Sequence, residues 1–366
     1  MFTVYCNTCL IHAPTFGNND MLLPSAKLTM EVNSASSFDF TILPSHKYYD
    51  EIILNALVKI YDGSERIFFG RISDVRKDLY RRKVVHVDGD LSFLDDIAVR
   101  NYTQTSGISL YLTALCAQYN NYADTSRLFE APLFYGSAAA QAITITRSSV
   151  SYQSILDEIR EKVISALGGY MWTDCVVSNG VEKSRLCYVL DESPQGNQTI
   201  TFGRNMIDLT DYVDKANTFS AIIPLGAETN SVTHERLNIK SVNNNAIQLE
   251  NATLSALYGY VEKRVIYDDI TDATALKAKG QADLDNVAAR TRTITISAVD
   301  LHLLDVNVDA LKLGYAYQVI APKNGLNGEF FVLSKIKIDL NKPEAGNYIF
   351  GLVRKTLTGG LTNWQT

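Results

Sequence analysis

The residues that could do chemistry in this chain are few and widely spaced. Cys6-Asn7-Thr8-Cys9 is a C-x-x-C motif, which alone could indicate a zinc site or redox chemistry. A zinc site needs a second pair of ligands, and Cys116, Cys175 and Cys187 do not supply one at suitable spacing. A thioredoxin-like site needs the motif between a strand and a helix, whereas this one lies in the first ten residues. We therefore expect ordinary reduced cysteines.

The histidines form no metal-binding or catalytic motif. None of them belongs to H-E-x-x-H, although His234-Glu235-Arg236 begins like that motif and lacks the second histidine. The sequence also has no G-x-S-x-G elbow, no Walker loop and no G-x-G-x-x-G. The five histidines are His12, His46, His86, His234 and His302. The sequence therefore predicts no catalytic, metal-binding or cofactor-binding residue, and no cofactor.

Paired carboxylates remain a possible source of hydrolytic chemistry. Forty acidic residues make adjacent pairs such as Asp95-Asp96 and Asp268-Asp269 inevitable, and glycosidase carboxylates are recognised by their separation in space. Asp95-Asp96 follows an apolar segment, so a turn after a strand is the simpler interpretation. Cys116 and Cys175 could serve a cysteine-histidine peptidase. Cys116 lies near the apolar face of a predicted helix and Cys175 lies in a predicted strand, so both are expected to be buried.

A group of basic residues stands out near residue 80. The simpler interpretation is a solvated hairpin tip, and the functional alternative is a charged contact with a neighbouring subunit. The group comprises Arg76, Lys77, Arg81, Arg82 and Lys83.

Composition excludes several classes of protein. The 366 residues include 34 basic and 40 acidic ones, a net charge of -6, so tight binding of DNA through its phosphates is not expected. No stretch of 18 apolar residues is present, so we expect no membrane insertion. The N-terminus lacks the features of a signal peptide, which indicates synthesis in the cytoplasm.

The first hundred residues predict a small antiparallel barrel. Ser37 to Leu43 alternates apolar and polar residues, as a half-buried strand does. Leu57 to Tyr61 ends at Asp62-Gly63, a hairpin signal, and Arg66 to Ile72 and Lys83 to Val87 follow. Several short strands with turns about every ten residues are typical of a barrel or sandwich.

Helices enter after Arg100. Ile108, Leu112, Leu115 and Tyr119 share one helical face, with Ser106 as the expected cap. A second helix is predicted from Tyr152 to Leu167, capped by Ser151 and ended by Gly168-Gly169. A hairpin turning at Ser178-Asn179-Gly180 follows. The predicted segments of this hairpin are Tyr170 to Val177 and Ser184 to Leu190.

The last third of the chain returns to strands. A helix is predicted from Thr271 to Ala289, in which Gly280 indicates either close packing or a marginal helix. The predicted strands are Asn217 to Leu225, Thr291 to Val299, Tyr315 to Ile320, Glu329 to Ile338 and Asn347 to Val353.

Two of these β regions resemble each other. Lys59-Ile60-Tyr61 leads to Phe68-Phe69 and Asp78-Leu79, and Gln318-Val319-Ile320 leads to Phe330-Phe331 and Asp339-Leu340. Either any two hairpins look alike, or a barrel is duplicated at the two ends of the chain. In the second case three subunits would close a ring of six similar units.

The sequence thus predicts an α+β, β-rich fold with two similar small antiparallel β-barrels. We expect the first barrel at 1–100 and a mixed α/β middle lobe at 101–212. The second barrel is expected at 213–228 and 291–366, with an inserted lobe carrying a helix at 229–290.

Several of these segments also resemble one family, the tail-associated hub proteins of long-tailed phages of Gram-positive bacteria. These minor structural proteins are often named prophage tail endopeptidases. The segments that carry the resemblance are Leu43 to Tyr49, Phe68 to Ile72, Gly89 to Leu94, Ala221 to Ala227, Ser297 to Leu301, Gly314 to Val319 and Leu352 to Thr358.

The resemblance implies a homotrimeric baseplate hub, similar in fold to the hub of contractile tails and located at the tail tip of the virion. Such a hub closes or channels the end of the tail tube and docks the distal tail protein. Tape measure and receptor-binding proteins are further expected partners, and DNA would pass without specific binding. Longer family members carry a cell-wall hydrolase domain. This chain reaches Gly359-Gly360 and stops at Thr366, so we expect no such domain in the sequence as given and no enzyme activity. Gly359-Gly360 is either the stub of a linker to a further part or the natural end.

Two alternatives stay open. A cell-wall (peptidoglycan) hydrolase could use carboxylates of the middle lobe. A carbohydrate-binding module is suggested by 20 tyrosines and two tryptophans, but Trp172 and Trp364 lie far apart in the sequence.

Overall fold

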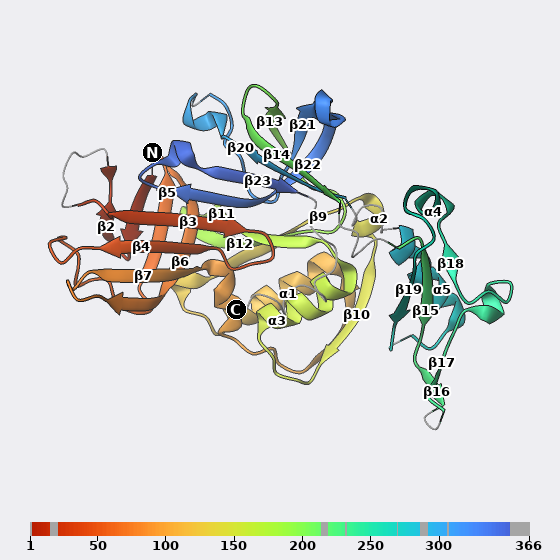
Figure 1. The fold of residues 1–366 in the computed structure, drawn as a ribbon. Helices are drawn as coiled ribbons and strands as arrows, with labels where there is room; N and C mark the ends of the chain where they lie inside the picture. The colour runs from red at the N-terminus through yellow and green to blue at the C-terminus, as the bar shows by residue number, and fades with distance from the viewer. Residues whose placement is uncertain are drawn as a thin grey trace. The chain divides into compact units, whose positions relative to one another are not determined.

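The computed structural model describes residues 2–14, 21–213, 219–230, 233–268, 270–285, 292–305 and 307–351. The chain divides into two compact units, Met1–Leu209 with Ile296–Thr366, and Thr210–Thr295. Strands outnumber helices (Figure 1), so the β-rich α+β class predicted from the sequence is confirmed. Within these ranges no helix combines the length and apolar content needed to cross a bilayer.

The first β region is a curled antiparallel sheet. In order across the sheet its strands are β3 (Ser25–Glu31), β4 (Ser37–Ile42), β7 (Lys83–Gly89), β6 (Glu65–Lys77), β5 (Leu57–Asp62), β1 (Phe2–Cys6) and β2 (Cys9–His12). Phe38, Phe40 and Ile42 alternate along β4 and are buried in its core. After β2 the chain returns to the start of β3, where the Leu23 N–H donates to Nδ1 of His12 at 3.2 Å.

The second β region has a similar order. Its strands are β13 (Gln195–Thr201), β21 (Ala316–Ala321), β22 (Leu326–Asp339), β23 (Asn347–Gly351), β20 (Arg292–Ala298) and β14 (Met206–Val213). Its core includes Leu333, Tyr317 and Phe350, and the last two rings meet edge to face at 5.7 Å.

The two β regions are joined edge to edge in one 13-stranded sheet, because β22 pairs antiparallel with β3. The register places Ile336 opposite Met30 and Ile338 opposite Leu28. Strand β22 is 14 residues long, so its first half pairs with β21 and its second half reaches β3. The regions that the sequence predicts as two barrels therefore share a continuous backbone ladder.

The segments β5–β6–β7 and β21–β22–β23, here called the first and second meanders, repeat one local geometry. In each meander the long middle strand bulges at a serine, Ser73 in β6 and Ser334 in β22. The serine hydroxyls donate to backbone carbonyls of the next strand, at 3.4 Å to His86 and 3.1 Å to Ile349. Because a bulge interrupts a ladder at one defined residue, these serines align the two meanders.

Two further features agree with this alignment. A residue in the left-handed region precedes each meander, Asn55 with φ 64° and Gly314 with φ 79°. The turn after each long strand begins at an aspartate, Asp78 or Asp339, whose carboxylate accepts the backbone N–H two residues later. The repeat suggested by the sequence is therefore present in the structure.

The register corrects one detail of that repeat. Phe69 lies opposite Lys59, and Phe330 lies opposite Gln318, the residue equivalent to Lys59. Phe69 and Phe330 are thus equivalent, and the Phe-Phe pairs of the two segments are offset by one residue. Both hairpins bulge at the equivalent place, between Ile60 and Tyr61 and between Val319 and Ile320, so the bulges leave the two meanders in register and the two Phe-Phe pairs occupy different positions in it.

The middle lobe packs helices against a hairpin. Its sheet contains β9 (Phe129–Tyr135), β12 (Val181–Val189) and β11 (Tyr170–Ser178), and a separate pair contains β8 (Tyr102–Gly107) and β10 (Thr144–Ser149). Its helices are α1 (Ile108–Asn120), α2 (Ala138–Gln141) and α3 (Ile155–Ile159). Figure 1 shows α1 and α3 near each other, and both share a core with Met171 and Leu186 of the hairpin. The hairpin turns at Asn179 and Gly180, as predicted.

The caps of the two predicted helices differ from expectation. Gly107 rather than Ser106 is the N-cap of α1, and no side chain caps it. The second helix begins at Ile155 because Tyr152 has φ 53°, outside the helical region, and Ser154 caps it instead of Ser151. Residues 160–165 continue this helix in the wider π form.

The inserted lobe has its own small sheet. Its elements are β15 (Ala221–Leu225), β16 (Glu228–Asn230), β17 (Glu235–Arg236), β18 (Leu249–Glu250), α4 (Ala252–Tyr258), β19 (Glu262–Ile266) and α5 (Ala273–Asp285). The sequence analysis places 213–228 in the second barrel, but β15 pairs with β18 and β19, which occupy both of its edges. The predicted close packing of Gly280 is observed, since a Cβ there would lie 3.0 Å from Pro224. Residues 286–289 of the predicted helix lie outside the described residues.

Candidate functional site

The C-x-x-C motif lies on a tight hairpin. Cys6 ends β1 and Cys9 begins β2, so the two residues face each other across the turn. Burial raises the pKa of the Cys6 thiol to about 12. Reactive cysteines have lowered pKa values, so this thiol is poorly suited to redox or nucleophilic chemistry. Burial also raises the pKa of Cys116 to about 12.

Each histidine has a local partner, and of the five only His12 and His46 lie close together. Burial lowers the pKa of His12 to about 4, and its Nδ1 accepts the Leu23 N–H. His46 Nε2 lies 2.9 Å from the Ile11 carbonyl. His86, His234 and His302 contact Asp39, Glu228 and the Val308 carbonyl, respectively. In the part of the chain that the structure describes, no three His, Cys, Asp or Glu side chains gather as metal ligands.

The acidic pairs singled out from the sequence serve structural contacts. Asp96 binds Arg71 at 2.6 Å and Arg127 at 3.0 Å. Asp95 accepts the hydroxyl of Ser154, the cap of α3. Of the other pair, Asp268 contacts Arg236, and Asp269 lies outside the described residues.

A cavity of about 430 Å³ opens between the two β regions and the β11–β12 hairpin. Two ion pairs border it, Arg185–Asp174 at 2.7 Å and Lys312–Glu65 at 3.0 Å. Its other polar lining residues include Arg66, Asp90, Thr173 and His302. The mixture of charges gives it no strong preference for either sign of ligand.

Asp90 is the most unusual titratable group of this cavity. Burial raises the pKa of its carboxyl, and hydrogen bonds from Ser184 and Thr173 oppose that rise. Arg66 reaches the Ser184 hydroxyl at 3.4 Å. A raised carboxyl pKa is typical of catalytic acids, but both oxygens of Asp90 are occupied by hydroxyl donors. The arrangement ties the first β region to the hairpin.

A second buried carboxylate lies in the middle lobe, and the sequence analysis did not identify it. Glu158 of α3 is fully buried and accepts hydrogen bonds from Tyr102, Tyr111 and Gln153. These partners come from three segments, so the cluster holds the lobe together. The tyrosines have raised pKa values, first through burial, so they remain protonated donors.

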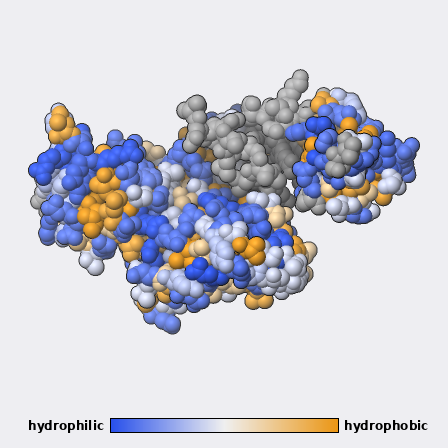
Figure 2. Space-filling model, turned by 90° about the horizontal axis from the view of Figure 1, so that it is seen from below, coloured by the Kyte–Doolittle hydropathy of each residue, from blue (hydrophilic) through white to orange (hydrophobic). Residues whose placement is uncertain are grey.

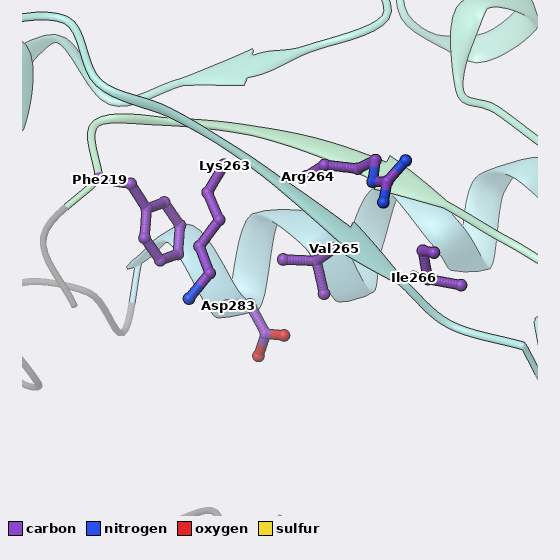
Figure 3. Close-up of a pocket in the computed structure, with 6 residues that line it drawn as sticks. All are labelled: Phe219, Lys263, Arg264, Val265, Ile266 and Asp283. Carbon is purple, nitrogen blue, oxygen red and sulfur yellow. The ribbon is translucent and has the colours of Figure 1, made fainter. Parts of the chain in front are cut away.

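The inserted lobe has a cavity of about 410 Å³ beside β19 and α5. Figure 3 shows the lining residues Phe219, Lys263, Arg264, Val265, Ile266 and Asp283. The Lys263 ammonium lies 5.3 Å from the centre of the Phe219 ring, and Asp283 accepts the Tyr267 hydroxyl. The lining includes no histidine, cysteine or serine.

The basic group lies at the β6–β7 turn, and only part of it is solvated. Arg76 and Arg82 pair with Asp74 and Asp78, each at 2.6 Å. Lys83, in contrast, is buried and donates to two backbone carbonyls.

The same turn presents apolar residues that the sequence analysis did not identify. Leu79 is 92% exposed and Tyr80 is 73% exposed. Figure 2 shows small apolar patches on a largely hydrophilic face, one of them at the left, over the first β region. Exposed apolar side chains that gather in one place are typical of interaction sites.

The comparisons with known proteins point to phage tails. Residues 194–359 match the family model described as prophage endopeptidase tail. No curated protein sequence matches the chain.

Solved structures match along almost the whole chain. The 43 kDa tail protein of prophage MuSo2 from Shewanella oneidensis has a TM-score of 0.63 and 10% identity, covering 97% of this chain and 98% of that chain. A tail protein from Neisseria meningitidis MC58 has a TM-score of 0.59 and 13% identity, covering 96% and 95%.

A third structure extends the likeness to another assembly. The c3393 protein of E. coli, a type VI secretion component with structural similarity to the T4 bacteriophage tail proteins gp27 and gp5, has a TM-score of 0.50 and 8% identity, covering 91% and 74%. At these identities the likeness concerns the fold. The chain therefore has the fold of phage tail proteins over nearly its whole length, and its residues 194–359 match the prophage endopeptidase tail family.

Proposed function

We propose that this protein is a structural component of a phage or prophage tail tip, a homotrimeric baseplate hub. The observation that carries the proposal is the repeated meander within one 13-stranded sheet. A subunit with two similar β regions can form a ring of six similar units from three copies. Such a ring would match a sixfold tail tube on one side and a threefold tip on the other.

The proposed partners follow from this position. The ring would dock the distal tail protein, and the tape measure and receptor-binding proteins are further candidates. The net charge of -6 suits a passage that DNA crosses without binding. The similarity of the E. coli c3393 protein to T4 tail proteins supports a tail-hub role for this fold.

The test is the mass of the purified protein in solution, measured by light scattering after size exclusion. A mass near three times 40.6 kDa is expected for the hub. A single-chain mass at every concentration, also with a distal tail protein present, would refute the trimer.

A second candidate function is peptidoglycan hydrolysis, for which the word endopeptidase in the description of the matching family speaks. Zymography on cell walls separates the two functions. Clearing by the purified protein that a mock preparation lacks would establish the enzyme, and intact walls with several hosts would leave the structural role.

A further inference from the structure

The turn of the second meander is buried against the first β region. The Leu340 N–H donates to the Ala26 carbonyl at 2.8 Å, and the Asn341 side chain donates to the Leu23 carbonyl at 3.1 Å. Leu340 is only 2% exposed. The contact continues the β22–β3 ladder, in which Lys335 also pairs with Glu31 at 2.7 Å. The turn of the second meander therefore docks on strand β3 and the residues just before it.

The equivalent turn of the first meander has no such cover. The alignment at the bulge serines makes Leu79 the counterpart of Leu340, and Leu79 is 92% exposed. The edge equivalent to the β3-paired half of β22 is Asp74–Lys77 of β6. Among the strands that the structure describes, none pairs with the outer side of this edge. An exposed strand edge ending in an apolar residue is a site for pairing with another chain.

The counterpart of β3 in the second β region is the strand that could pair with the free edge of β6. Strands β4 and β20 are equivalent, because each is the neighbour of the third strand of its meander, β7 or β23. The next strand outward is β3 in the first region and β14 in the second. Strand β14 is the end strand of the sheet as described. Its Ile207 and the preceding Phe202 are each 61% exposed.

The geometry points to a head-to-tail contact between two copies of this chain. The outer edge of β6 in one copy pairs antiparallel with β14 of the next, and Leu79 becomes buried against Phe202 and Ile207. The intrachain β22–β3 junction is the template for this contact. The inference rests on the proposed function, because three such junctions alternate with three intrachain junctions in a ring of six similar β regions.

Charge also suits this pairing. The β6 edge and turn carry Arg76, Lys77, Arg81 and Arg82 against Asp74 and Asp78, a basic surplus, whereas Asp208 of β14 is acidic. Opposite charges across paired strands favour one partner and one register. The template also holds an ion pair across its strands, Lys335–Glu31, although the counterpart of Lys335 in the first meander is Asp74. A second copy of the chain therefore fits this edge in backbone geometry, apolar residues and charge.

The test uses the full chain and three matched substitutions of exposed residues. Leu79→Glu removes the apolar turn, Ile207→Glu alters β14, and Leu110→Glu is the control on α1, where Leu110 is 65% exposed. Light scattering over a range of concentrations gives the dissociation constants. We expect the first two variants to weaken assembly at least tenfold and the control to match the unchanged chain.

Mixing separates a head-to-tail contact from a symmetric one. The Leu79→Glu chain keeps an intact β14, and the Ile207→Glu chain keeps an intact turn. An equimolar mixture is therefore expected to form dimers with one working junction, although each variant alone is monomeric. Mixtures that stay monomeric would overturn the head-to-tail pairing.

The outcomes distinguish this contact from the proposed function. An unchanged chain that stays monomeric at every concentration overturns both. A trimer that persists in Leu79→Glu or in Ile207→Glu overturns the contact and leaves the hub. Loss of the trimer in Leu110→Glu as well would mean that the effect is not specific to this edge, and would also overturn the contact.

Discussion

The two meanders of the sheet share their bulges, their left-handed residues and their turn hydrogen bonds, yet their turns lie in opposite environments. Leu340 is 2% exposed against the first β region, whereas Leu79 is 92% exposed. The start of each turn is therefore the same with and without a docking partner. Beyond that start the turns differ, because Arg81 has φ 61° in the first turn, whereas the second turn continues into the 3-10 helix Pro343–Ala345. The local segment thus sets how each turn begins, and the neighbouring strand decides whether its leucine is covered.

The residues that precede the meanders differ in the same way. Asn55 is exposed, whereas a Cβ on Gly314 would lie 2.5 Å from the Trp172 ring. Asparagine tolerates the left-handed region, so it suffices where space is open. Glycine is required where the backbone also passes close to a large side chain.

Substituting Gly314 and Asn55 should give the largest difference in the free energy of unfolding. Gly314→Ala should lower the free energy of unfolding by roughly 3–5 kcal/mol, through backbone strain at positive φ and overpacking against Trp172. Asn55→Ala should cost about 1 kcal/mol, because only the strain term applies. Urea unfolding monitored by circular dichroism measures both. Equal losses would show that the crowding at Gly314 is relieved at little cost.

Substituting the two turn leucines, Leu340 and Leu79, should give the next largest difference in the free energy of unfolding. Leu340→Ala should cost about 3 kcal/mol, the usual loss for a buried leucine that leaves a cavity. Leu79→Ala should cost less than about 0.5 kcal/mol in the single chain, because its side chain is already in water. The comparison is made in the Ile207→Glu background, where assembly does not contribute. A large loss for Leu79→Ala there would mean that the turn packs within its own chain.

Acid should weaken the first β region, which buries His12 beside the docked turn. Burial lowers the pKa of His12 to about 4, below the 6.5 of an unfolded histidine. Between these values the unfolded state binds more protons, so stability falls as the pH falls, by about 2 kcal/mol from pH 7 to 5.

The control for this prediction is His12→Asn, which removes the titrating group. The pKa of the half-buried His86 is raised, since the contacts with Asp39 and Asp88 outweigh its partial burial, and its effect has the opposite sign. His86 is present in both proteins and cancels in the comparison. Parallel pH curves for the two proteins would contradict a neutral buried His12.

Much of the fold could be predicted from the sequence, and the reason is local periodicity. The alternation in β4 and the turn at Asn179-Gly180 each depend on a few adjacent residues. The cap of α3 could not be fixed in the same way, since Ser151 and Ser154 are equally good caps by type. The backbone of Tyr152 decides between them, and it depends on the surrounding structure.

Pairings between distant segments could not be predicted from the sequence for a different reason. The pairing of β15 with β18 and β19, and of β22 with β3, joins segments whose apolar patterns would also fit other partners. The buried Glu158 cluster was equally hidden, because one carboxylate among 40 acidic residues carries no distinguishing pattern. The exposed Leu79 stands out as a candidate contact residue only because its counterpart Leu340 is buried.

Substituting the bulge serines Ser334 and Ser73 should give the smallest change in the free energy of unfolding, and it tests the repeat most directly. The Ser334 hydroxyl bonds to the Ile349 carbonyl at 3.1 Å in a partly buried place, so Ser334→Ala should cost about 1 kcal/mol. Ser73 makes the equivalent bond at 3.4 Å in the open, where water replaces it, so Ser73→Ala should cost less than about 0.5 kcal/mol. Denaturant unfolding of both variants measures the pair. Because the two bonds have equivalent partners in the ladder, a difference between them reports their burial and their lengths. If Ser73→Ala cost as much as Ser334→Ala, the first meander would have to be as well covered as the second, and the contrast between the two turns would fail.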